Sequence, residues 1–306
     1  SIAWNDSLFM ESWEVKCVSD TRPPFYEITE VKPLNNATPH ALFIDLGASA
    51  SDVWVVNDGY WGIAVTEGQR YNFQFYLFTE ELKNTVVTAA LLDCEEQIVV
   101  SKNFQIERDG SWNHYEGAFT VDTTANDLRF ALLLPHKGKV YIDFVSMFPE
   151  NTFCGHKNGL REDVAGMLRD LRPDFVRWPG GCIVEGLTMD NRIKWKETIG
   201  DIVKRPGEYN LWGYRSTYGF GYHEFLQFCE DIDADGLFVC NAGMSCLFRN
   251  GDYWEEENRI DNLIQDALDA VEYALGDTTT VYGKRRAENG HAAPFPLKYV
   301  EVGNEN

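Results

Sequence analysis

The chain has 306 residues, of which 44% are hydrophobic and 25% are charged, a composition that is ordinary for a globular protein of one large or two medium-sized domains. Its net charge of −21, from 48 acidic against 27 basic side chains, disfavours binding to the phosphate backbone of nucleic acids but does not penalise a neutral ligand. The longest apolar stretches, such as residues 130–135, are too short to cross a membrane. No signal peptide is visible, which leaves the localisation open.

The first half of the chain predicts an all-β domain. Short runs rich in β-branched and aromatic residues recur there, separated by turn residues such as Asp109-Gly110. Six such runs predict strands at 53–56, 71–78, 86–92, 112–121, 128–134 and 140–148. Because no helix is expected between them, residues 1–150 predict a two-sheet β-sandwich of the jelly-roll type.

The pattern changes from about residue 155. Apolar residues at helical spacing predict a helix over 160–171, which Pro173 ends. Further along the chain we expect a strand at 174–178, a helix at 222–232, a strand at 236–241, an amphipathic helix at 260–275 and a strand at 297–302. Strands that alternate with helices indicate parallel strands joined by crossover helices.

Each of these strands ends in residues that are unusual for a strand end. The three segments are Arg177-Trp178-Pro179-Gly180-Gly181, Asn241-Ala242-Gly243 and Gly303-Asn304-Glu305. A (β/α)8 barrel builds its active site at the C-terminal ends of its strands. A doubly wound sheet also binds ligands there, but its GxGxxG phosphate loop is absent. A whole barrel needs eight strands and roughly 250 residues, so residues 151–306 predict a partial TIM barrel.

The segment Gly303-Asn304-Glu305 carries the most chemistry. A glycosidase needs a carboxylic acid that protonates the leaving oxygen and a second carboxylate on the other side of the bond. Glu305 at a strand end, beside the Asn304 amide, suits the first role. Taken alone the dipeptide is weak evidence, and a structural salt bridge or a solvated position of Glu305 remains an alternative.

The seven cysteines form no CxxC pair, and their odd number and irregular spacing argue against a complete disulfide framework. Cys229, Cys240 and Cys246 could bind zinc together with His223, but their spacing fits no common zinc site. We therefore interpret them as buried thiols and predict no metal site.

Five longer segments over about residues 150–306 are Phe175-Val176-Arg177-Trp178-Pro179-Gly180-Gly181-Cys182-Ile183-Val184-Glu185-Gly186, Arg192-Ile193-Lys194-Trp195-Lys196-Glu197-Thr198-Ile199-Gly200, Gly221-Tyr222-His223-Glu224-Phe225-Leu226, Asn289-Gly290-His291 and Lys298-Tyr299-Val300-Glu301-Val302-Gly303-Asn304-Glu305. In content and order they resemble glycoside hydrolase family 51, the α-L-arabinofuranosidases, and above all the subgroup shared by plants and some bacteria. A weaker resemblance in the first half, Tyr60-Trp61-Gly62-Ile63-Ala64-Val65 and Gly68-Gln69-Arg70-Tyr71, matches the carbohydrate-binding-module-like sandwich that this subgroup inserts after the first barrel strand.

The resemblance implies roles for three residues at the strand ends. Glu305 matches the general acid/base, and Asn304 matches the amide that binds the sugar hydroxyl next to the reacting carbon. Arg177 matches an arginine that orients the carboxylates and tunes them electrostatically, and a salt bridge under the barrel is the alternative role. The resemblance also places the nucleophile on a later strand, beyond residue 306, so this chain alone is expected to be inactive.

Two further matched positions carry open alternatives. At Cys182 many bacterial relatives have Asn, whereas the plant-like subgroup also has Cys, so we expect a backbone contact with the sugar and no side-chain amide contact. Trp212 matches a tryptophan platform for the group beyond the scissile bond, or else it is a packing residue.

Four residues outside this set have a structural role as their main alternative. Helix-terminal packing or capping is favoured for His223 and Glu224, and a loop-fixing hydrogen bond is as plausible as substrate contact for Asn241. Trp61 could bind sugar, but a position in the core of the sandwich is favoured.

The predicted function is a retaining hydrolysis that removes terminal α-L-arabinofuranosyl groups from arabinan, arabinoxylan or related oligosaccharides, with no metal or organic cofactor. The resemblance implies an arabinose-containing glycan as partner, no nucleic acid and no membrane, and it allows a homo-oligomer. The alternatives are a non-catalytic carbohydrate-binding protein and a related barrel glycosidase with another sugar specificity.

Overall fold

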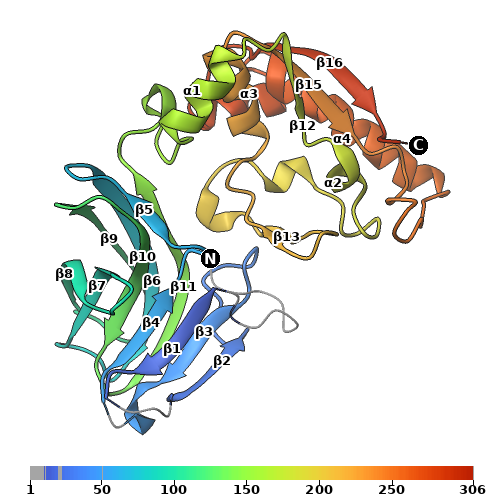
Figure 1. Ribbon diagram of the computed structural model, residues 1–306. Helices are drawn as coiled ribbons and strands as arrows, with labels where there is room; N and C mark the ends of the chain where they lie inside the picture. The colour runs from blue at the N-terminus through green and yellow to red at the C-terminus, as the bar shows by residue number, and fades with distance from the viewer. Residues whose placement is uncertain (1–9, 11, 20–22, 50, 306) are drawn as a thin grey trace. The chain divides into compact units, whose positions relative to one another are not determined.

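The computed structural model describes residues 10, 12–19, 23–49 and 51–305. Contacts divide the chain into two compact units, residues 1–162 and 163–306 (Figure 1). Among the helices of the described residues, none is both long and apolar enough to cross a lipid bilayer.

The first unit consists of two large antiparallel sheets. One has the strand order β1-β4-β10-β7-β8, with β5 paired to β10, and the other has the order β2-β3-β11-β6-β9. The strands are β1 (Trp13–Cys17), β2 (Phe25–Thr29), β3 (Ala41–Asp45), β4 (Val53–Asn57), β5 (Ile63–Val65), β6 (Arg70–Glu80), β7 (Val86–Leu92), β8 (Ile98–Gln105), β9 (Trp112–Thr120), β10 (Ala125–Leu134) and β11 (Lys139–Pro149), with a short 3-10 helix η2 (Leu46–Ala48) after β3.

The two sheets of the first unit share one apolar core. Strand β6 alternates strictly, so that Phe73, Phe75 and Leu77 are buried while the residues between them lie nearer to solvent. These side chains belong to the same cluster as Leu132 of the other sheet, and the ring of Phe73 stacks on Phe119 with centroids 4.3 Å apart. The alternation thus gives each sheet one apolar face, and the two faces pack against each other.

All six strands that the sequence predicts in this unit are present, as β4, β6, β7, β9, β10 and β11. The prediction of two-layer β structure is confirmed at the level of two antiparallel sheets, whereas the jelly-roll type stays a prediction. Strands β1, β2, β3, β5 and β8 were not predicted. They are short or, like β8, face solvent along most of their length, so they lack the alternation that marks a half-buried strand.

The preference for a core position of Trp61 is wrong. Its side chain is 96% exposed, and its neighbour Tyr60 is 60% exposed. The reason is a tight turn after β4, in which Trp61 N–H donates to Gly59 O at 2.9 Å and Gly62 N–H donates to Asp58 O at 3.0 Å. The turn lies between β4 and β5, which both run antiparallel to β10, and it leaves the indole in solvent.

The second unit contains a three-stranded parallel sheet with the order β12-β15-β16. Helix α3 connects β12 to β15, and α4 and α5 connect β15 to β16 (Figure 1), as expected for parallel strands with crossover helices. The elements are α1 (Glu162–Asp170, which begins at the end of the first unit), β12 (Phe175–Trp178), α2 (Gly181–Glu185), β13 (Glu208–Tyr209), β14 (Arg215–Ser216), α3 (Tyr222–Asp231), β15 (Asp235–Cys240), α4 (Glu257–Leu275), α5 (Val281–Glu288) and β16 (Leu297–Val302). Three 3-10 turns also occur, η3 (Phe153–Gly155) in the first unit and η4 (Trp195–Glu197) and η5 (Ile202–Lys204) in the second.

Aromatic side chains form the core between this sheet and its helices. On α3 the buried residues Tyr222, Phe225 and Cys229 follow helical spacing and face the sheet. Trp178 of β12 stacks on Phe225 with ring centroids 5.7 Å apart, and Phe238 of β15 belongs to the same cluster. This packing fixes the direction of the strands, and with it the position of the loops that leave their C-terminal ends.

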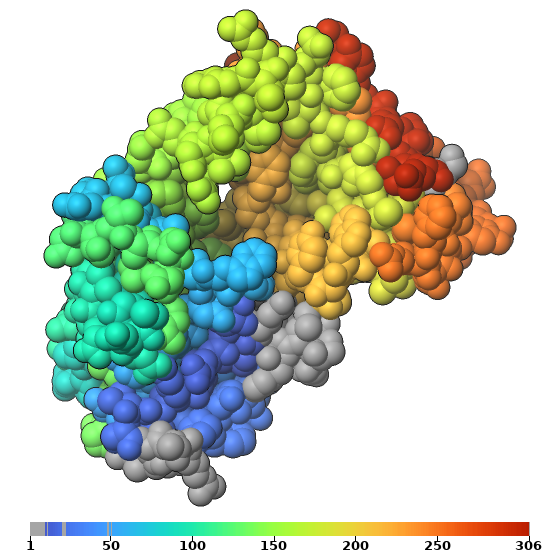
Figure 2. Space-filling model, viewed as in Figure 1, coloured from blue at the N-terminus to red at the C-terminus, as the bar shows by residue number. Residues whose placement is uncertain are grey.

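Part of the apolar surface of the second unit is exposed. Met167 of α1 and Leu171, directly after the end of α1, follow the helical spacing that predicts the helix, but they are 70% and 76% exposed. Val302 of β16 is 73% exposed, and in Figure 2 the red C-terminal segment that includes β16 lies open at the surface of this unit. The spacing therefore predicts the α1 helix, but it does not predict what the apolar side of that helix contacts.

Candidate active site

The C-terminal ends of β12, β15 and β16 bring three separate loops to one edge of the parallel sheet. Trp178 is in register with Phe238, Cys240 is in register with Val302, and Gly303 N–H continues the ladder by donating to Cys240 O at 2.8 Å. Because neighbouring parallel strands end at the same edge, the loop after Trp178 and the segment after Val302 lie close together.

Arg177 is the centre of the polar contacts at this edge. Its Nε donates to Glu301 Oε2 at 2.7 Å and its Nη2 donates to Glu301 Oε1 at 2.6 Å, which is the two-point geometry typical of arginine and carboxylate. The same Nη2 donates to Asn304 Oδ1 at 3.0 Å. The hydrogen bonds with Glu301 raise the pKa of Arg177 and lower the pKa of Glu301. The salt bridge expected as the alternative role of Arg177 is present, and the same guanidinium also holds the Asn304 amide, whereas its role toward the catalytic carboxylates stays a prediction.

Asn304 is 7% exposed, accepts the hydrogen bond from Arg177 and lies close to a second carboxylate, Glu185. Glu185 is the last residue of α2 and is 3% exposed. Burial and, less strongly, the Glu305 carboxylate raise the pKa of Glu185, while the nearby polar groups of Asn304, Cys246 and Cys182 act in the opposite direction. The amide of Asn304 is thus held between a charged guanidinium and a buried carboxyl group.

Glu305 follows directly and has the positive φ of 54° that is uncommon for a residue with a side chain. Its carboxyl group is exposed at the edge of the sheet, and it interacts electrostatically with Arg177, Cys182 and Glu185. The structure thus brings together four of the five site residues that the sequence predicts: Arg177, Cys182, Asn304 and Glu305.

The turn from β12 into α2 needs its glycine. Gly180 has a φ of 68°, and a Cβ atom on it would lie 2.7 Å from Nη1 of Arg177. The turn therefore lets α2 start close to the guanidinium, which places Cys182 in the first turn of that helix. Burial raises the pKa of the Cys182 thiol to about 11, with contributions from Cys246 and the nearby carboxylates, so no activated nucleophile is found at this position.

Trp212 lies in the loop between β13 and β14, where its backbone N–H donates to Asn210 Oδ1 at 2.9 Å. Its side chain is 49% exposed, which contradicts the alternative of a buried packing residue. Its role as a platform for the group beyond the scissile bond stays a prediction.

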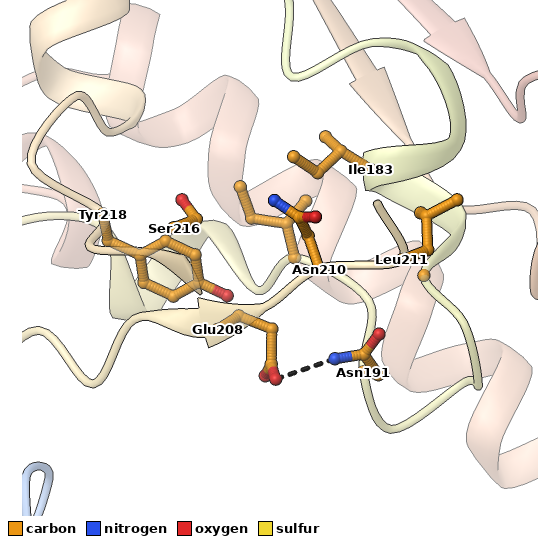
Figure 3. Close-up of a pocket in the computed structure, with 9 residues that line it drawn as sticks. Ile183, Asn191, Glu208, Asn210, Leu211, Ser216 and Tyr218 are labelled. Atoms are coloured by element: carbon orange, nitrogen blue, oxygen red, sulfur yellow. Dashed lines mark hydrogen bonds between the residues drawn. The ribbon is translucent and has the colours of Figure 1, made fainter. Parts of the chain in front are cut away.

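The neighbours of Trp212 line a small pocket, which Figure 3 shows. Asn191 donates to Glu208 Oε1 and to Tyr209 O, both at 2.7 Å, and burial raises the pKa of Glu208. The lining residues are Ile183, Gly186, Asn191, Ile193, Glu208, Asn210, Leu211, Ser216 and Tyr218. None of the five predicted site residues lines this pocket, and its hydrogen bonds fix the loop that carries Trp212.

The main alternatives for three other residues are confirmed. Glu224 Oε2 accepts the Gly221 N–H at 2.9 Å as the capping residue of α3, and His223 Nδ1 pairs with the Tyr273 hydroxyl at 2.7 Å. Asn241 fixes a loop, because its Nδ2 donates to Val184 O at 2.9 Å and to Met244 O at 3.1 Å.

Two residues of this network, Glu301 and Glu185, were not singled out from the sequence, and Cys246 was considered only with Cys229, Cys240 and His223. Glu301 left a signal, since a glutamate inside a parallel strand needs a basic partner, and Arg177 is the matching charge inside another strand of the same sheet. The meeting of Glu185 with Cys246 could not be predicted, because nothing in the local sequence of either residue indicates it.

Comparison with known proteins identifies the family. Residues 167–306 match a family model described as the α-L-arabinofuranosidase 1 domain. The chain is 36% identical over 275 residues to an extracellular exo-α-L-arabinofuranosidase of Streptomyces chartreusis, covering 86% of this chain and 32% of that protein. It is 35% identical over 260 residues to α-L-arabinofuranosidase 2 of Arabidopsis thaliana, covering 83% of this chain and 37% of that protein.

A solved structure of an arabinose-bound family 51 α-L-arabinofuranosidase matches the fold with a TM-score of 0.86 and 28% identity. The match covers 96% of this chain and 47% of that one. The chain thus spans about a third of the length of the two curated relatives above. From its family model, its relatives and its fold, the chain belongs to glycoside hydrolase family 51, the family of the α-L-arabinofuranosidases.

Proposed function

We propose that the complete protein removes terminal α-L-arabinofuranosyl groups from arabinan, arabinoxylan or related oligosaccharides, with retention of configuration. The observation that carries the proposal is the network of Arg177, Glu301 and Asn304 beside Glu305 at the C-terminal edge of the parallel sheet. The names of the relatives, all α-L-arabinofuranosidases, support the sugar specificity.

In this mechanism Glu305 protonates the oxygen of the leaving group and then removes a proton from the water that completes the reaction. Asn304 binds the sugar hydroxyl next to the reacting carbon, and Arg177 positions Asn304 by its hydrogen bond of 3.0 Å. The nucleophilic carboxylate comes from another part of the complete protein, about 5 Å from Glu305 as a retaining mechanism requires. This chain alone is then inactive.

Two further residues complete the proposed site. Cys182 offers its backbone to the sugar after the glycine turn, and the half-exposed Trp212 forms a platform for the group beyond the scissile bond. The exposure of Trp212 supports this role, since a flat ring that contacts a sugar must be open to solvent before it binds.

The proposal includes an architecture for both halves. Residues 1–150 form a jelly-roll domain resembling a carbohydrate-binding module, and residues 151–306 contribute about strands 2 to 4 of a TIM barrel. The parallel order β12-β15-β16 and the similarity to the arabinose-bound structure support this assignment. Glu305 would then follow the fourth barrel strand, at the edge where such barrels build their active sites.

The test is an assay of the complete protein on aryl α-L-arabinofuranosides with good and poor leaving groups. Without its acid, the Glu305→Ala variant should fail on poor leaving groups, and azide should partly restore its turnover on good ones. The matched control is Glu288→Ala, an exposed carboxylate of α5 at the opposite end of the parallel strands. Full activity of Glu305→Ala would remove Glu305 from the mechanism, and a preference for aryl xylosides or glucosides would overturn the sugar specificity.

A second candidate function is glycan binding by the first unit, and the exposure of Trp61 favours it. Adjacent rings at 96% and 60% exposure, Trp61 and Tyr60, offer an apolar surface of the kind that packs against sugar faces. We expect Trp61→Ala to weaken the binding of the complete protein to soluble arabinan, measured by affinity electrophoresis, and to leave turnover of aryl arabinofuranosides unchanged. Equal retardation of wild type and variant would exclude this surface.

A further inference from the structure

Two thiols and one buried carboxyl group converge behind the Asn304 amide. The sulfur atoms of Cys182 and Cys246 and a carboxylate oxygen of Glu185 all lie within 4.8 Å of one another. Cys182 and Glu185 are three residues apart on α2, so they project from the same side of that helix. Cys246 comes from the loop after β15.

The position of Cys246 against α2 is fixed by the backbone. Its own N–H donates to Gly186 O at 3.1 Å, directly after α2 ends. Earlier in the same loop, Asn241 Nδ2 donates to Val184 O at 2.9 Å. Later in the loop, Asp252 Oδ2 accepts the Met189 N–H at 3.0 Å. The loop is therefore held to α2 and its following segment at three points, and the cluster does not depend on the side chains alone.

The environment of Glu185 favours a cation. Its side chain is 3% exposed and Cys246 is 1% exposed. Burial is the largest influence on the pKa of Glu185, and the nearby Glu305 carboxylate raises this pKa further. A buried carboxylate is costly unless an opposite charge compensates it, and a bound cation would supply that charge.

The donor set selects the kind of cation. Two cysteine sulfurs with one carboxylate suit Zn²⁺ or Cd²⁺, whereas Ca²⁺ and Mg²⁺ prefer oxygen ligands throughout. Tetrahedral zinc has Zn–S distances of about 2.3 Å, which places two sulfur ligands about 3.8 Å apart. In this cluster the three ligand atoms all lie within 4.8 Å of one another, which is at most about 1 Å more than a tetrahedral zinc site needs, and small side-chain rotations can close this difference.

We propose that Cys182, Glu185 and Cys246 bind one soft divalent cation, with water at the fourth position.

Binding of a cation here has a consequence for the neighbouring site. Glu185 lies close to the buried Asn304 amide and interacts with it electrostatically, and a carboxylate that ligates a metal interacts less strongly with the amide. Soft cations should therefore inhibit turnover of aryl arabinofuranosides, a consequence that rests on the proposed function. The cation binding itself does not rest on it.

The experiment measures binding directly on the complete protein, reduced and freed of metal. Cd²⁺ is titrated while the ultraviolet charge-transfer band of cadmium thiolates is recorded, and Zn²⁺ binding is measured by calorimetry. We expect Cys182→Ser and Cys246→Ser each to bind one equivalent of Cd²⁺ fewer than the wild type, and Glu185→Gln to bind at least about 10-fold more weakly. The matched control is Cys94→Ser, which changes an exposed cysteine of the first unit and should bind as the wild type does.

Circular dichroism establishes that each variant is folded. Cys182 is only partly buried, so Cys182→Ser carries the test if Cys246→Ser does not fold. An unchanged cadmium stoichiometry in Cys182→Ser would overturn the proposal. If the wild type binds the cation with the expected stoichiometry but its turnover is not inhibited, the site stands and only its link to Asn304 is contradicted. If the wild type binds the cation but has no activity on aryl arabinofuranosides, only the proposed function is contradicted.

Discussion

Asp143 makes the stability of the first unit depend on pH. It lies within β11 and is 1% exposed. Its Oδ1 accepts the Phe144 N–H at 2.7 Å, while its Oδ2 is buried with no hydrogen-bond partner among the described residues. Burial raises the pKa of Asp143 from 3.8 to about 7, and the Phe144 hydrogen bond offsets this only in part.

The sign of the effect follows from the higher pKa of the folded state. Between about pH 4 and pH 7 the folded protein keeps a proton on Asp143 that the unfolded chain has lost, so stability falls as the pH rises. The stabilisation is fully present below the unfolded pKa of 3.8 and is lost as the pH passes through about 7. One pKa unit corresponds to 1.36 kcal/mol, so a shift of about three units removes about 4 kcal/mol from the free energy of unfolding.

The variant Asp143→Asn keeps the shape of the protonated side chain and cannot ionise. We expect it to lose most of this pH dependence and to be more stable than the wild type at pH 8, although an unpaired amide could cost it some stability at pH 4. Native-state hydrogen exchange of β11 peptides, corrected for the intrinsic exchange rate, reports the free energy of unfolding in the complete protein. Asp122→Asn, an exposed aspartate of the same unit, is the control. The same pH slope in Asp143→Asn as in the wild type would refute the reasoning.

Two further changes test the second unit. Glu301→Gln weakens the two-point pairing with Arg177, and with it the orientation of Asn304. The kcat/KM on aryl arabinofuranosides should therefore fall on the order of 100-fold while the circular dichroism spectrum is unchanged. Wild-type kinetics of this variant would show that the pairing does not position the site. The backbone of Gly221 has a φ of −104°, which any residue can adopt, but the Cβ of Gly221→Ala would lie 1.9 Å from the Thr198 carbonyl oxygen. This steric clash should lower the free energy of unfolding by on the order of 2–4 kcal/mol. Gly166→Ala in α1, whose Cβ would meet nothing nearer than 3.9 Å, should instead raise the thermal midpoint slightly, and equal midpoints for the two variants would contradict the packing at the start of α3.

Local periodicity was enough to predict most of the secondary structure. The alternation in β6 and the helical spacing of Tyr222, Phe225 and Cys229 in α3 are properties of single segments, because burial of one face repeats every two residues in a strand and every 3.6 in a helix. The strand-end motifs likewise located Arg177 and Asn304 without any coordinates. Strand β8 was not predicted because most of its residues face solvent and it shows no alternation. The exposure of Trp61 was predicted wrongly because a turn, and not a periodic pattern, decides it.

The tertiary structure alone decided which of these motifs meet. The pairing of Arg177 with Glu301 joins residues 124 positions apart, and it exists because the parallel register of β12, β15 and β16 places both side chains at one edge of the sheet. The meeting of Cys182 with Cys246 depends in the same way on a loop that the backbone fixes against α2. A sequence pattern reports how one segment divides its side chains between core and solvent. Contacts between distant segments depend on register and packing, which no single segment encodes.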